Sequence, residues 1–394
     1  MPKLLNTFAP PFSLVGAYFF VAIILAMISV FVYFGADFGA LMSLKTASFF
    51  HLFLVGFVMS IIIGSLYQLS SVILDKPFYS LKGSYANLVF YIIDLIVFVA
   101  GLYSQNMVLI GFGGVMLFLN LTYFGLVYML TFLNVKELSF AGICLFVSSV
   151  MLIIGLCLGL LLVLILVLNL DFDFVRILDL HLYFVFGFIF FVVLGASSVL
   201  LSMFSLAHNV SFGFYYSSFG LYLLAGLLLL FRSQDTIMAI IFAALMLVAQ
   251  CVMILRNRVR KAYDYWSINL IISFISLVCS AIMYKFGSIN SAIILLFYGA
   301  LYPFITAHIY KIMPFLIWYH YVAKFVGKTK VPMLEDMVIK KFTYIAILFD
   351  LCGIAIELIV SKFGTFFIAV SIFFVILNML NFIRYTKFGV QNDR

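Results

Sequence analysis

Long apolar stretches separated by short polar segments recur along the whole chain. Each stretch holds about 20 residues, the length that an α-helix needs to cross a bilayer. The pattern predicts an all-α polytopic membrane protein with twelve transmembrane helices. Their expected limits are 12–34, 48–74, 84–104, 107–133, 138–169, 181–207, 213–231, 235–255, 266–284, 291–320, 343–361 and 364–385. Pro303 and Pro314 interrupt the tenth stretch, so we expect kinks there.

The composition narrows the function classes. Hydrophobic residues make up 67% of the 394 residues and charged residues only 9%, whereas about a quarter of the residues of a soluble protein are charged. A soluble enzyme, a nucleic-acid-binding protein and a disordered chain are therefore excluded, and the lipid bilayer is the expected partner. The five cysteines stand singly inside apolar stretches, which predicts neither a disulfide framework nor a thiolate metal site.

The distribution of Lys and Arg predicts the orientation. With a cytoplasmic N-terminus, 16 of the 22 basic residues fall in cytoplasmic segments, five fall in outer loops, and Lys311 lies within a span. Basic residues concentrate on the cytoplasmic side of membrane proteins. We therefore expect both termini to lie inside, in a bacterial cytoplasmic membrane, with the acidic loop at 170–180 on the outer face.

Small residues recur at matching positions in the second, sixth and tenth helices, as pairs eight residues apart. These pairs are Gly56 and Gly64, Gly187 and Gly195, and Gly299 and Ala307. The recurrence predicts one transmembrane domain over 1–394, built from three pseudo-symmetric four-helix units at about 12–133, 138–255 and 266–385. Small residues at this spacing let helices approach closely, so helix packing explains the glycines.

Four of the five histidines lie at equivalent levels of this repeat. His51 and His181 lie 13 and 14 residues before the second small residue, at the predicted outer ends of their helices. His208 and His320 lie 13 residues after it, at the predicted cytoplasmic ends. The recurrence favours a metal-ligand or channel-lining role for the outer pair. For the inner pair, a ligand role and an ordinary interfacial role stay open as equal alternatives.

Ionisable residues also lie within the predicted spans. They are Asp94, His308, Lys311, Asp350 and Glu357. A charge in the hydrocarbon region is costly and usually functional. We predict that Lys311 pairs with Asp350 on the inner half of the bundle, and that Glu357 lies nearer the membrane centre and is protonated. The pair is either structural or part of a proton or ion path that includes His308 and Asp94.

The second helix resembles the second helix of the catalytic subunit of heme-copper oxidases and nitric oxide reductases. It reads HLFLVGFVMSIIIGSLYQLSSVIL, and the match rests on His51, Ile63, Gly64, Tyr67 and Leu69. Twelve helices in three groups of four, with both termini inside, are also typical of that family. The resemblance implies a cytochrome oxidase subunit I-like fold. It also implies that His51 is an axial heme ligand and that His181 corresponds to a metal ligand.

The sequence departs from this family at the other ligand positions. The family's seventh helix carries two adjacent histidines, whereas this one reads GFYYSSFGLYLLAGLLLLF, and the residues before Gly299 read SAIILLFY. Dioxygen reduction by the family's mechanism is therefore not expected. The resemblance implies a protein that binds heme, copper or another transition metal in respiratory redox chemistry or cofactor handling, with a respiratory-chain or assembly partner.

Two further classes stay open beside this one. The first is an ion-coupled transporter or channel-like protein that uses the intramembrane Lys, Asp and Glu residues. The second is a structural subunit of a larger complex. The sequence decides neither whether the protein is an enzyme nor whether it forms a homo-oligomer.

Overall fold

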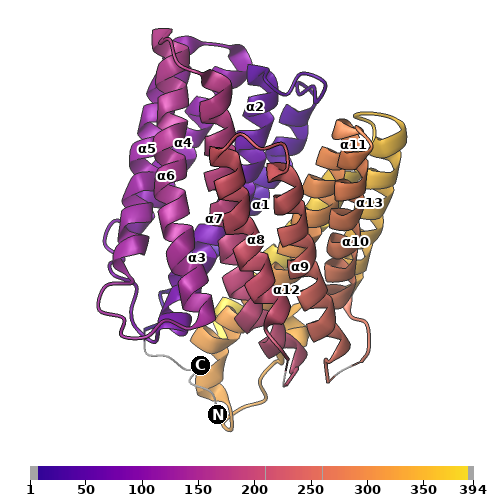
Figure 1. The fold of residues 1–394 in the computed structure, drawn as a ribbon. Coiled ribbons are helices and arrows are strands. Elements are labelled where there is room, and N and C mark those ends of the chain that lie inside the picture. The colour runs from indigo at the N-terminus through magenta and orange to yellow at the C-terminus, as the bar shows by residue number, and fades with distance from the viewer. Residues whose placement is uncertain (1–7, 209, 260, 389–394) are drawn as a thin grey trace. The chain divides into compact units, whose positions relative to one another are not determined.

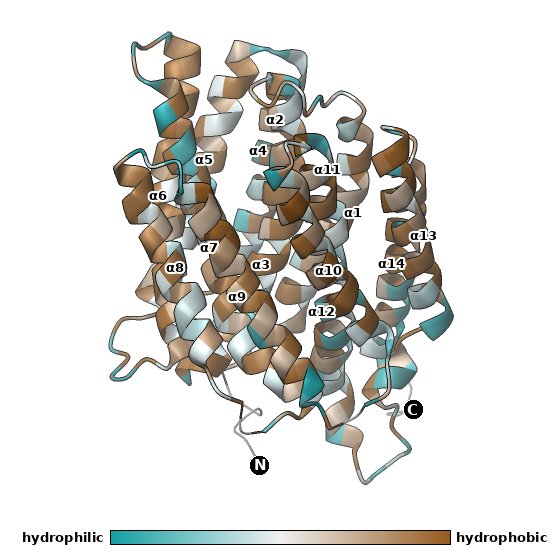
Figure 2. Ribbon diagram, turned by 45° about the vertical axis from the view of Figure 1, so that its right-hand side comes forward, coloured by the Kyte–Doolittle hydropathy of each residue, from teal (hydrophilic) through white to brown (hydrophobic). Residues whose placement is uncertain are grey.

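The computed structural model describes residues 8–208, 210–259 and 261–388, which form helices joined by short loops. In these residues, twelve helices are long and apolar enough to cross a membrane, which confirms the predicted number and the all-α class. Figure 2 shows apolar residues along the helices and polar residues gathered near their ends. The protein is therefore an integral membrane protein.

Residues 65–261 belong to one compact unit, the first unit. Its helices are the end of α3 (Ser60–Leu74), α4 (Ser84–Ser104), α5 (Met107–Leu130), α6 (Phe140–Leu168), α7 (Phe174–Ser205), α8 (Gly213–Leu230) and α9 (Thr236–Arg256). Neighbours in sequence pack together, as α4 does with α5 and α6 with α7 (Figure 1). A Cβ at Gly113 would lie 2.6 Å from the backbone nitrogen of Phe98, so only glycine permits the close approach of α5 to α4.

Residues 11–64 join the chain from Ala262 onward in the second unit. Its elements are α1 (Phe12–Tyr33), α2 (Leu44–Phe50), η1 (His51–Met59), the start of α3, α10 (Tyr265–Lys285), α11 (Ile289–Ile294), η2 (Leu295–Leu301), α12 (Tyr302–Ile317), η3 (Trp318–Val322), η4 (Ala323–Phe325), η5 (Leu334–Met337), α13 (Lys340–Ile359), α14 (Thr365–Arg384) and η6 (Tyr385–Lys387). We call Leu44–Leu74 helix 2 and Ile289–Phe325 helix 10. In this unit α12 packs on α10 and α14, and α14 also packs on α1 and α13.

The two ends of the second unit differ in charge. The basic end is the end at which α1 and α10 begin and α14 finishes, and it carries Lys324, Lys340, Lys341 and Arg384. At the opposite end α1, α10 and α13 finish. The sequence predicts that the basic end faces the cytoplasm.

Helices 2 and 10 are not regular α-helices. In the described residues, three segments have the wider π-helical geometry, namely 51–59, 295–301 and 318–322. Pro303 is the second residue after the second π segment, and Pro314 lies within α12 shortly before the third. A proline removes one helical hydrogen bond and crowds the preceding turn, and π segments often mark functional sites. The two prolines at which kinks are expected thus lie beside irregular segments of the tenth span.

The first two π segments pack against each other through aromatic rings. The rings of Phe53 and Phe297 are stacked with their centroids 4.8 Å apart, and Tyr298 meets Phe53 edge-on at 5.4 Å. Each segment also contains one of the repeated glycines, Gly56 or Gly299. Helices 2 and 10 therefore share a distortion as well as a sequence pattern, whereas α7 is α-helical throughout.

The repeated glycines lie at tight helix contacts. A Cβ at Gly64 would lie 2.9 Å from the Cβ of Tyr18, and a Cβ at Gly299 would lie 2.7 Å from the Cβ of Ser276. In the first unit, a Cβ at Gly195 would lie 3.0 Å from the carbonyl oxygen of Ala141 on α6. Gly187 has a looser contact, because its nearest neighbour would lie at 3.2 Å. This geometry agrees with a packing role for these glycines.

Several helices begin earlier than their apolar stretches do. Helix 2 begins at Leu44, where the side chain of Ser43 accepts a hydrogen bond from the backbone N–H of Thr46 (3.1 Å). Asp173 caps α7 in the same way, at 3.0 Å from the N–H of Arg176. Capping residues are polar and lie outside the apolar stretch. The expected limits at 48 and 181 are therefore too late, and the expected loop at 170–180 is largely helical.

Candidate functional site

The polar residues inside the second unit lie in stripes along its helices. On helix 10, Tyr298, Tyr302, Thr306 and Tyr310 recur every four residues, and on α13, Thr343, Asp350 and Glu357 recur every seven. Such spacings keep side chains on one helical face. A third stripe on α10 consists of Asn269, Ser273, Ser276 and Ser280, and a fourth on α14 consists of Ser371 and Asn378. All of these residues are buried, so polar faces meet in the interior of the unit.

Asp350 lies at the centre of these stripes. It is 2% exposed and lines a narrow cavity with Asn269 of α10, Thr306 of α12 and Ser371 of α14. Its Oδ1 atom is buried and has no hydrogen-bond partner among the described residues. The cavity also has no room for a water molecule. Asp350 is therefore a buried acid with one unsatisfied oxygen.

The hydroxyl groups around this cavity fall into two classes. Three are engaged, because the Tyr302 hydroxyl and Ser371 Oγ are 3.0 Å apart and the Thr343 hydroxyl donates to the carbonyl oxygen of Lys340 (2.7 Å). Two others, those of Thr306 and Tyr310, are buried and have no partner in the described residues. These two hydroxyls can donate hydrogen bonds into the Asp350 cavity, which they line.

Glu357 forms a second acidic site towards the opposite end. The Tyr33 hydroxyl of α1 donates to Glu357 Oε1 (2.7 Å), and the backbone N–H of Lys362 donates to the same oxygen (2.5 Å). The other oxygen, Oε2, is buried and has no partner among the described residues. Tyr298, whose ring meets that of Tyr33 edge-on at 6.3 Å, lies within electrostatic range of both Glu357 and Asp350. Tyr298 thus lies near both acidic sites.

The depth of the two acids differs from the expectation. Because α13 covers Lys340–Ile359, Asp350 lies at its middle and Glu357 lies near its C-terminal end. Seven residues correspond to about 10 Å along a helix. In the structure Asp350, and not Glu357 as predicted, is the acid nearer the middle of the span, and the expected limits 343–361 also place Asp350 nearer the middle.

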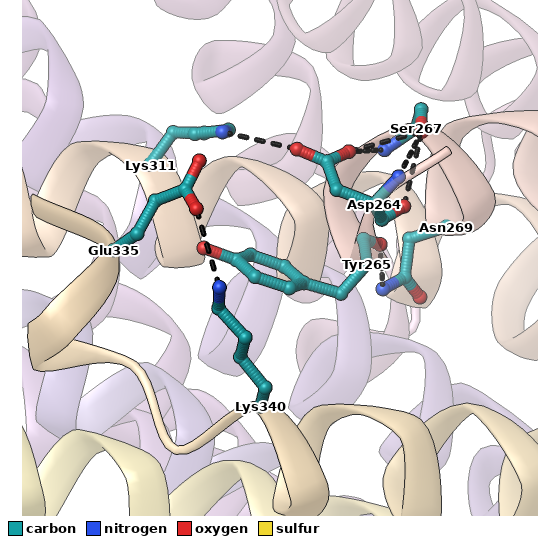
Figure 3. Close-up of polar contacts among 7 residues, drawn as sticks. All are labelled: Asp264, Tyr265, Ser267, Asn269, Lys311, Glu335 and Lys340. Atoms are coloured by element: carbon teal, nitrogen blue, oxygen red, sulfur yellow. Dashed lines mark hydrogen bonds and ion pairs between the residues drawn. The ribbon is translucent and has the colours of Figure 1, made fainter. Parts of the chain in front are cut away.

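Lys311 does not pair with Asp350. Its Nζ atom lies 3.3 Å from Oδ2 of Asp264, the residue that caps the N-terminus of α10, and the two side chains point toward each other in Figure 3. Nζ also lies 5.7 and 5.6 Å from the ring centroids of Tyr265 and Trp266. A lysine side chain is long enough to carry its charge towards the interface. The predicted Lys311 to Asp350 pair is thus corrected to a pair with a residue just outside the spans.

The surroundings of Asp264 keep its carboxyl ionised. Burial raises its pKa, but the backbone N–H of Ser267, 2.9 Å from Oδ1, and the charge of Lys311 outweigh burial and hold the pKa below its ordinary value. The ion pair lies at the basic end of the polar stripes. Tyr265, which follows Asp264 in the chain, meets Tyr310 of the helix 10 stripe edge-on at 5.6 Å. Tyr310 lines the Asp350 cavity.

The two histidines expected to bind a metal both contact backbone carbonyl groups. Nδ1 of His51 lies 2.8 Å from the carbonyl oxygen of Ala47 in its own helix. Nδ1 of His181 lies 2.9 Å from the carbonyl oxygen of Gly155 on α6, and its ring packs where a Cβ at Gly159 would lie. Both residues lie about two turns inside their helices, since these begin at Leu44 and Phe174. His51 marks the start of the first π segment.

The other three histidines have different surroundings. Nδ1 of His308 lies 2.7 Å from the carbonyl oxygen of Phe304, and His208 is exposed in a loop. His320 lies in the π segment 318–322, within helix 10 rather than after it, and its Nε2 is buried with no partner in the described residues. The chain positions of His208 and His320 are therefore not equivalent in structure.

The described residues contain no cluster of possible metal ligands. Among the described residues, no three His, Cys, Asp or Glu side chains come together in a group that could hold a metal ion. The residues present therefore do not fit a copper site or a heme-copper centre. The contact of Nδ1 of His51 with a carbonyl oxygen fits a single axial ligand. When a histidine binds a metal through one ring nitrogen, the other ring nitrogen usually contacts a carbonyl or carboxylate group.

Asp94 belongs to the first unit and has an amide partner. It is 6% exposed on α4 and interacts with the side chain of Asn120 on α5. Asn120 in turn donates to the carbonyl oxygen of Asn87 (3.2 Å). This acid is thus part of a polar contact between two neighbouring helices.

Comparison with known proteins supplies no family. The chain matches no protein-family model, and no curated protein sequence is significantly similar to it. The geometry of the chain's own residues is therefore the basis for a functional proposal.

Sequence reasoning missed most of the residues that surround the acids. Asp264, Tyr33, Tyr298 and Ser371 were not expected at a site. The signal for several of them is present in the sequence, as the four-residue spacing on helix 10 and the seven-residue spacing on α13. Tyr33 and Asp264 lie at helix ends, where no spacing indicates their partners.

Proposed function

We propose that this protein is an ion-coupled membrane transporter whose second unit moves a proton or a small cation along the polar stripes of α10, α12, α13 and α14. The observation that carries the proposal is the pair of buried acids, Asp350 and Glu357, each with one unsatisfied oxygen on the polar face of α13. Acids within membrane spans are rare and are typical of ion pathways.

A purely structural role explains these acids less well. Burying a polar group without a hydrogen bond costs about 1–3 kcal/mol, and burying an uncompensated charge costs more. A structural carboxyl group is expected to have both oxygens satisfied. Unsatisfied oxygens on both acids, and the unsatisfied hydroxyls of Thr306 and Tyr310 around Asp350, indicate groups that exchange partners during function.

The distortions of helix 10 support a transport cycle. The stripe begins at Tyr298 within the π segment 295–301 and ends at Tyr310, before the π segment 318–322. Pro303 and Pro314 lie in the same helix. Transporters commonly bind ions beside helices interrupted by Gly or Pro, because such helices can adopt two arrangements. Helix 10 is therefore the element that we expect to move when the ion binds.

The test is charge displacement in purified protein reconstituted on a solid-supported membrane. A jump in pH or in NaCl concentration gives a transient current when an ion enters the protein. We expect a current for the wild type and its loss in D350N and in E357Q, whereas D179N, the same chemical change at an exposed position of α7, should retain it. The proposal fails if the wild type gives no more current than a protein-free membrane after the pH jump and also after the NaCl jump.

The second candidate function is heme binding through His51, as the resemblance of the second helix implies. The contact of its Nδ1 with the carbonyl oxygen of Ala47 and its position at the start of a π segment favour this role. Such a heme would supply redox chemistry at one axial ligand. Purified protein should then show a Soret absorbance band that H51A removes, and a wild-type protein without that band after expression with added heme contradicts this candidate.

A further inference from the structure

We infer that the ion is a proton, that Asp350 is its central binding site, and that Glu357 exchanges it with the opposite end of the second unit. This inference rests on the proposed function and adds the identity of the ion. It starts from the space around Asp350. The cavity has no room for a water molecule, so a hydrated cation cannot enter it in this conformation.

The oxygen atoms around Asp350 also do not form a cage for a bare cation. Hard cations are bound by several oxygen ligands. Tyr302 and Ser371 are bonded to each other, and the hydroxyl proton of Thr343 is committed to the carbonyl oxygen of Lys340. The amide nitrogen of Asn269 donates to the carbonyl oxygen of Tyr265 (2.9 Å). The hydroxyls of Thr306 and Tyr310 stay available, and as donors they suit a carboxyl group.

No positive charge faces Asp350 from the helices around it. Helix 10 presents Tyr298, Tyr302 and Tyr310. Its Lys311 is bound to Asp264, its Lys324 lies at the basic end, and Nδ1 of its His308 contacts the carbonyl oxygen of Phe304. The other neighbours contribute no cation to the cavity: α10 presents Asn269 and serines, α14 has no titratable residue before Arg384, and α1 contributes Tyr33 beside Glu357. A buried carboxylate without a counter-charge costs several kcal/mol, and a bound proton removes that cost.

One hydroxyl group, that of Tyr298, neighbours both acids. Tyr298 lies within electrostatic range of Asp350 and Glu357, and its buried hydroxyl also interacts with the side chain of Ser29. The Asp350 carboxyl gives its proton to the oxygen of Tyr298, whose own proton passes to Oε2 of Glu357. Asp350 becomes the carboxylate, Glu357 becomes the acid, and Tyr298 is regenerated. The hydrogen bonds from Tyr33 and Lys362 to Oε1 hold the Glu357 side chain while Oε2 receives the proton.

Infrared difference spectroscopy of the full-length protein in lipid tests this assignment. A protonated carboxyl group has a carbonyl stretching band that a carboxylate lacks. We expect the wild type to show such a band at neutral pH, unchanged when NaCl replaces KCl. D350N should remove it, and D179N should leave it unchanged. D350E should retain the band with a shifted pH midpoint, which keeps the test valid if D350N does not fold.

The inference is overturned if the wild type shows no protonated carboxyl band, if D350N leaves the band intact, or if NaCl removes it. Charge displacement distinguishes this failure from failure of the proposed function. Currents after a NaCl jump but not after a pH jump retain the transporter and exclude the proton. The absence of currents after both jumps contradicts the transporter itself.

Discussion

The buried acid of the first unit has a side-chain partner, whereas the two buried acids of the second unit each keep one unsatisfied oxygen. In the first unit, the hydroxyls of Tyr183 and Tyr222 each donate to the other residue's carbonyl oxygen (3.1 and 2.9 Å), and the buried Asp94 has Asn120 as its partner. In the second unit, Asp350 and Glu357 each keep one oxygen without a partner among the described residues. A buried acid inside a membrane protein can thus hold helices together or serve an ion pathway. Whether each carboxyl oxygen has a hydrogen-bond partner distinguishes the two cases.

The largest expected effect breaks the packing of the first unit. In G113V the new Cβ would lie 2.6 Å from backbone atoms of α4, which cannot yield as a side chain can. We expect a loss of about 3 kcal/mol in the free energy of unfolding, measured as thermal unfolding in detergent. G220A is the control, because a Cβ at Gly220 meets nothing within 4 Å. It should stabilise the protein by about 0.5 kcal/mol, and equal losses in both variants contradict the packing argument.

A pair of tyrosine substitutions sharpens the comparison between the units. The Tyr128 hydroxyl donates to the carbonyl oxygen of Leu145 (2.9 Å), so Y128F should cost about 1 kcal/mol in unfolding free energy and leave the charge displacement intact. The Tyr310 hydroxyl has no partner among the described residues, so Y310F should leave stability unchanged or higher and slow the charge displacement. The reverse pattern in unfolding and current measurements contradicts the assignment of the two units.

The corrected ion pair gives a smaller effect. Lys311 and Asp264 have side chains only 21% and 25% exposed, so K311M and D264N should show a coupling of about 1 kcal/mol in a double-mutant cycle of thermal unfolding. K311M and D350L should show no such coupling. A larger coupling with Asp350 than with Asp264 restores the pair that the sequence predicted and overturns the one described above.

The smallest effect concerns pH. Because the pKa of Asp264 is lowered in the folded protein, its contribution to stability is complete above its ordinary value, about 3.9, and is lost as the pH falls through the lower folded value. Below about pH 4, the unfolding temperature should therefore decrease more steeply with falling pH in the wild type than in D264N. Parallel pH profiles for the two proteins show that Asp264 does not make this contribution.

The number of helices was predictable because each span is a local property of about 20 consecutive residues. Helix ends were less predictable, because Ser43 and Asp173 extend their helices beyond the apolar stretches. The three π segments have no sequence signal that we recognise. The three four-helix units stay a prediction, as does the resemblance to heme-copper oxidases.

The sequence predicted the two acids of the candidate site but not the residues that surround them. Asp350 and Glu357 stand out because charges inside apolar stretches are rare. The sequence predicted the wrong partner for Lys311, because charges stand out only inside apolar spans and Asp264 lies just outside one. The tyrosine and threonine stripe of helix 10 received little weight, since single hydroxyl residues in an aromatic-rich chain are not conspicuous without a partner helix.

The most direct test of the account is the charge displacement of the double variant D350N/E357Q after a pH jump. The account predicts that the double variant is folded, with an unfolding temperature close to that of D179N, and that it gives no more current than a protein-free membrane. A folded double variant whose pH-jump current equals that of D179N contradicts the claim that these two acids conduct the ion through the second unit.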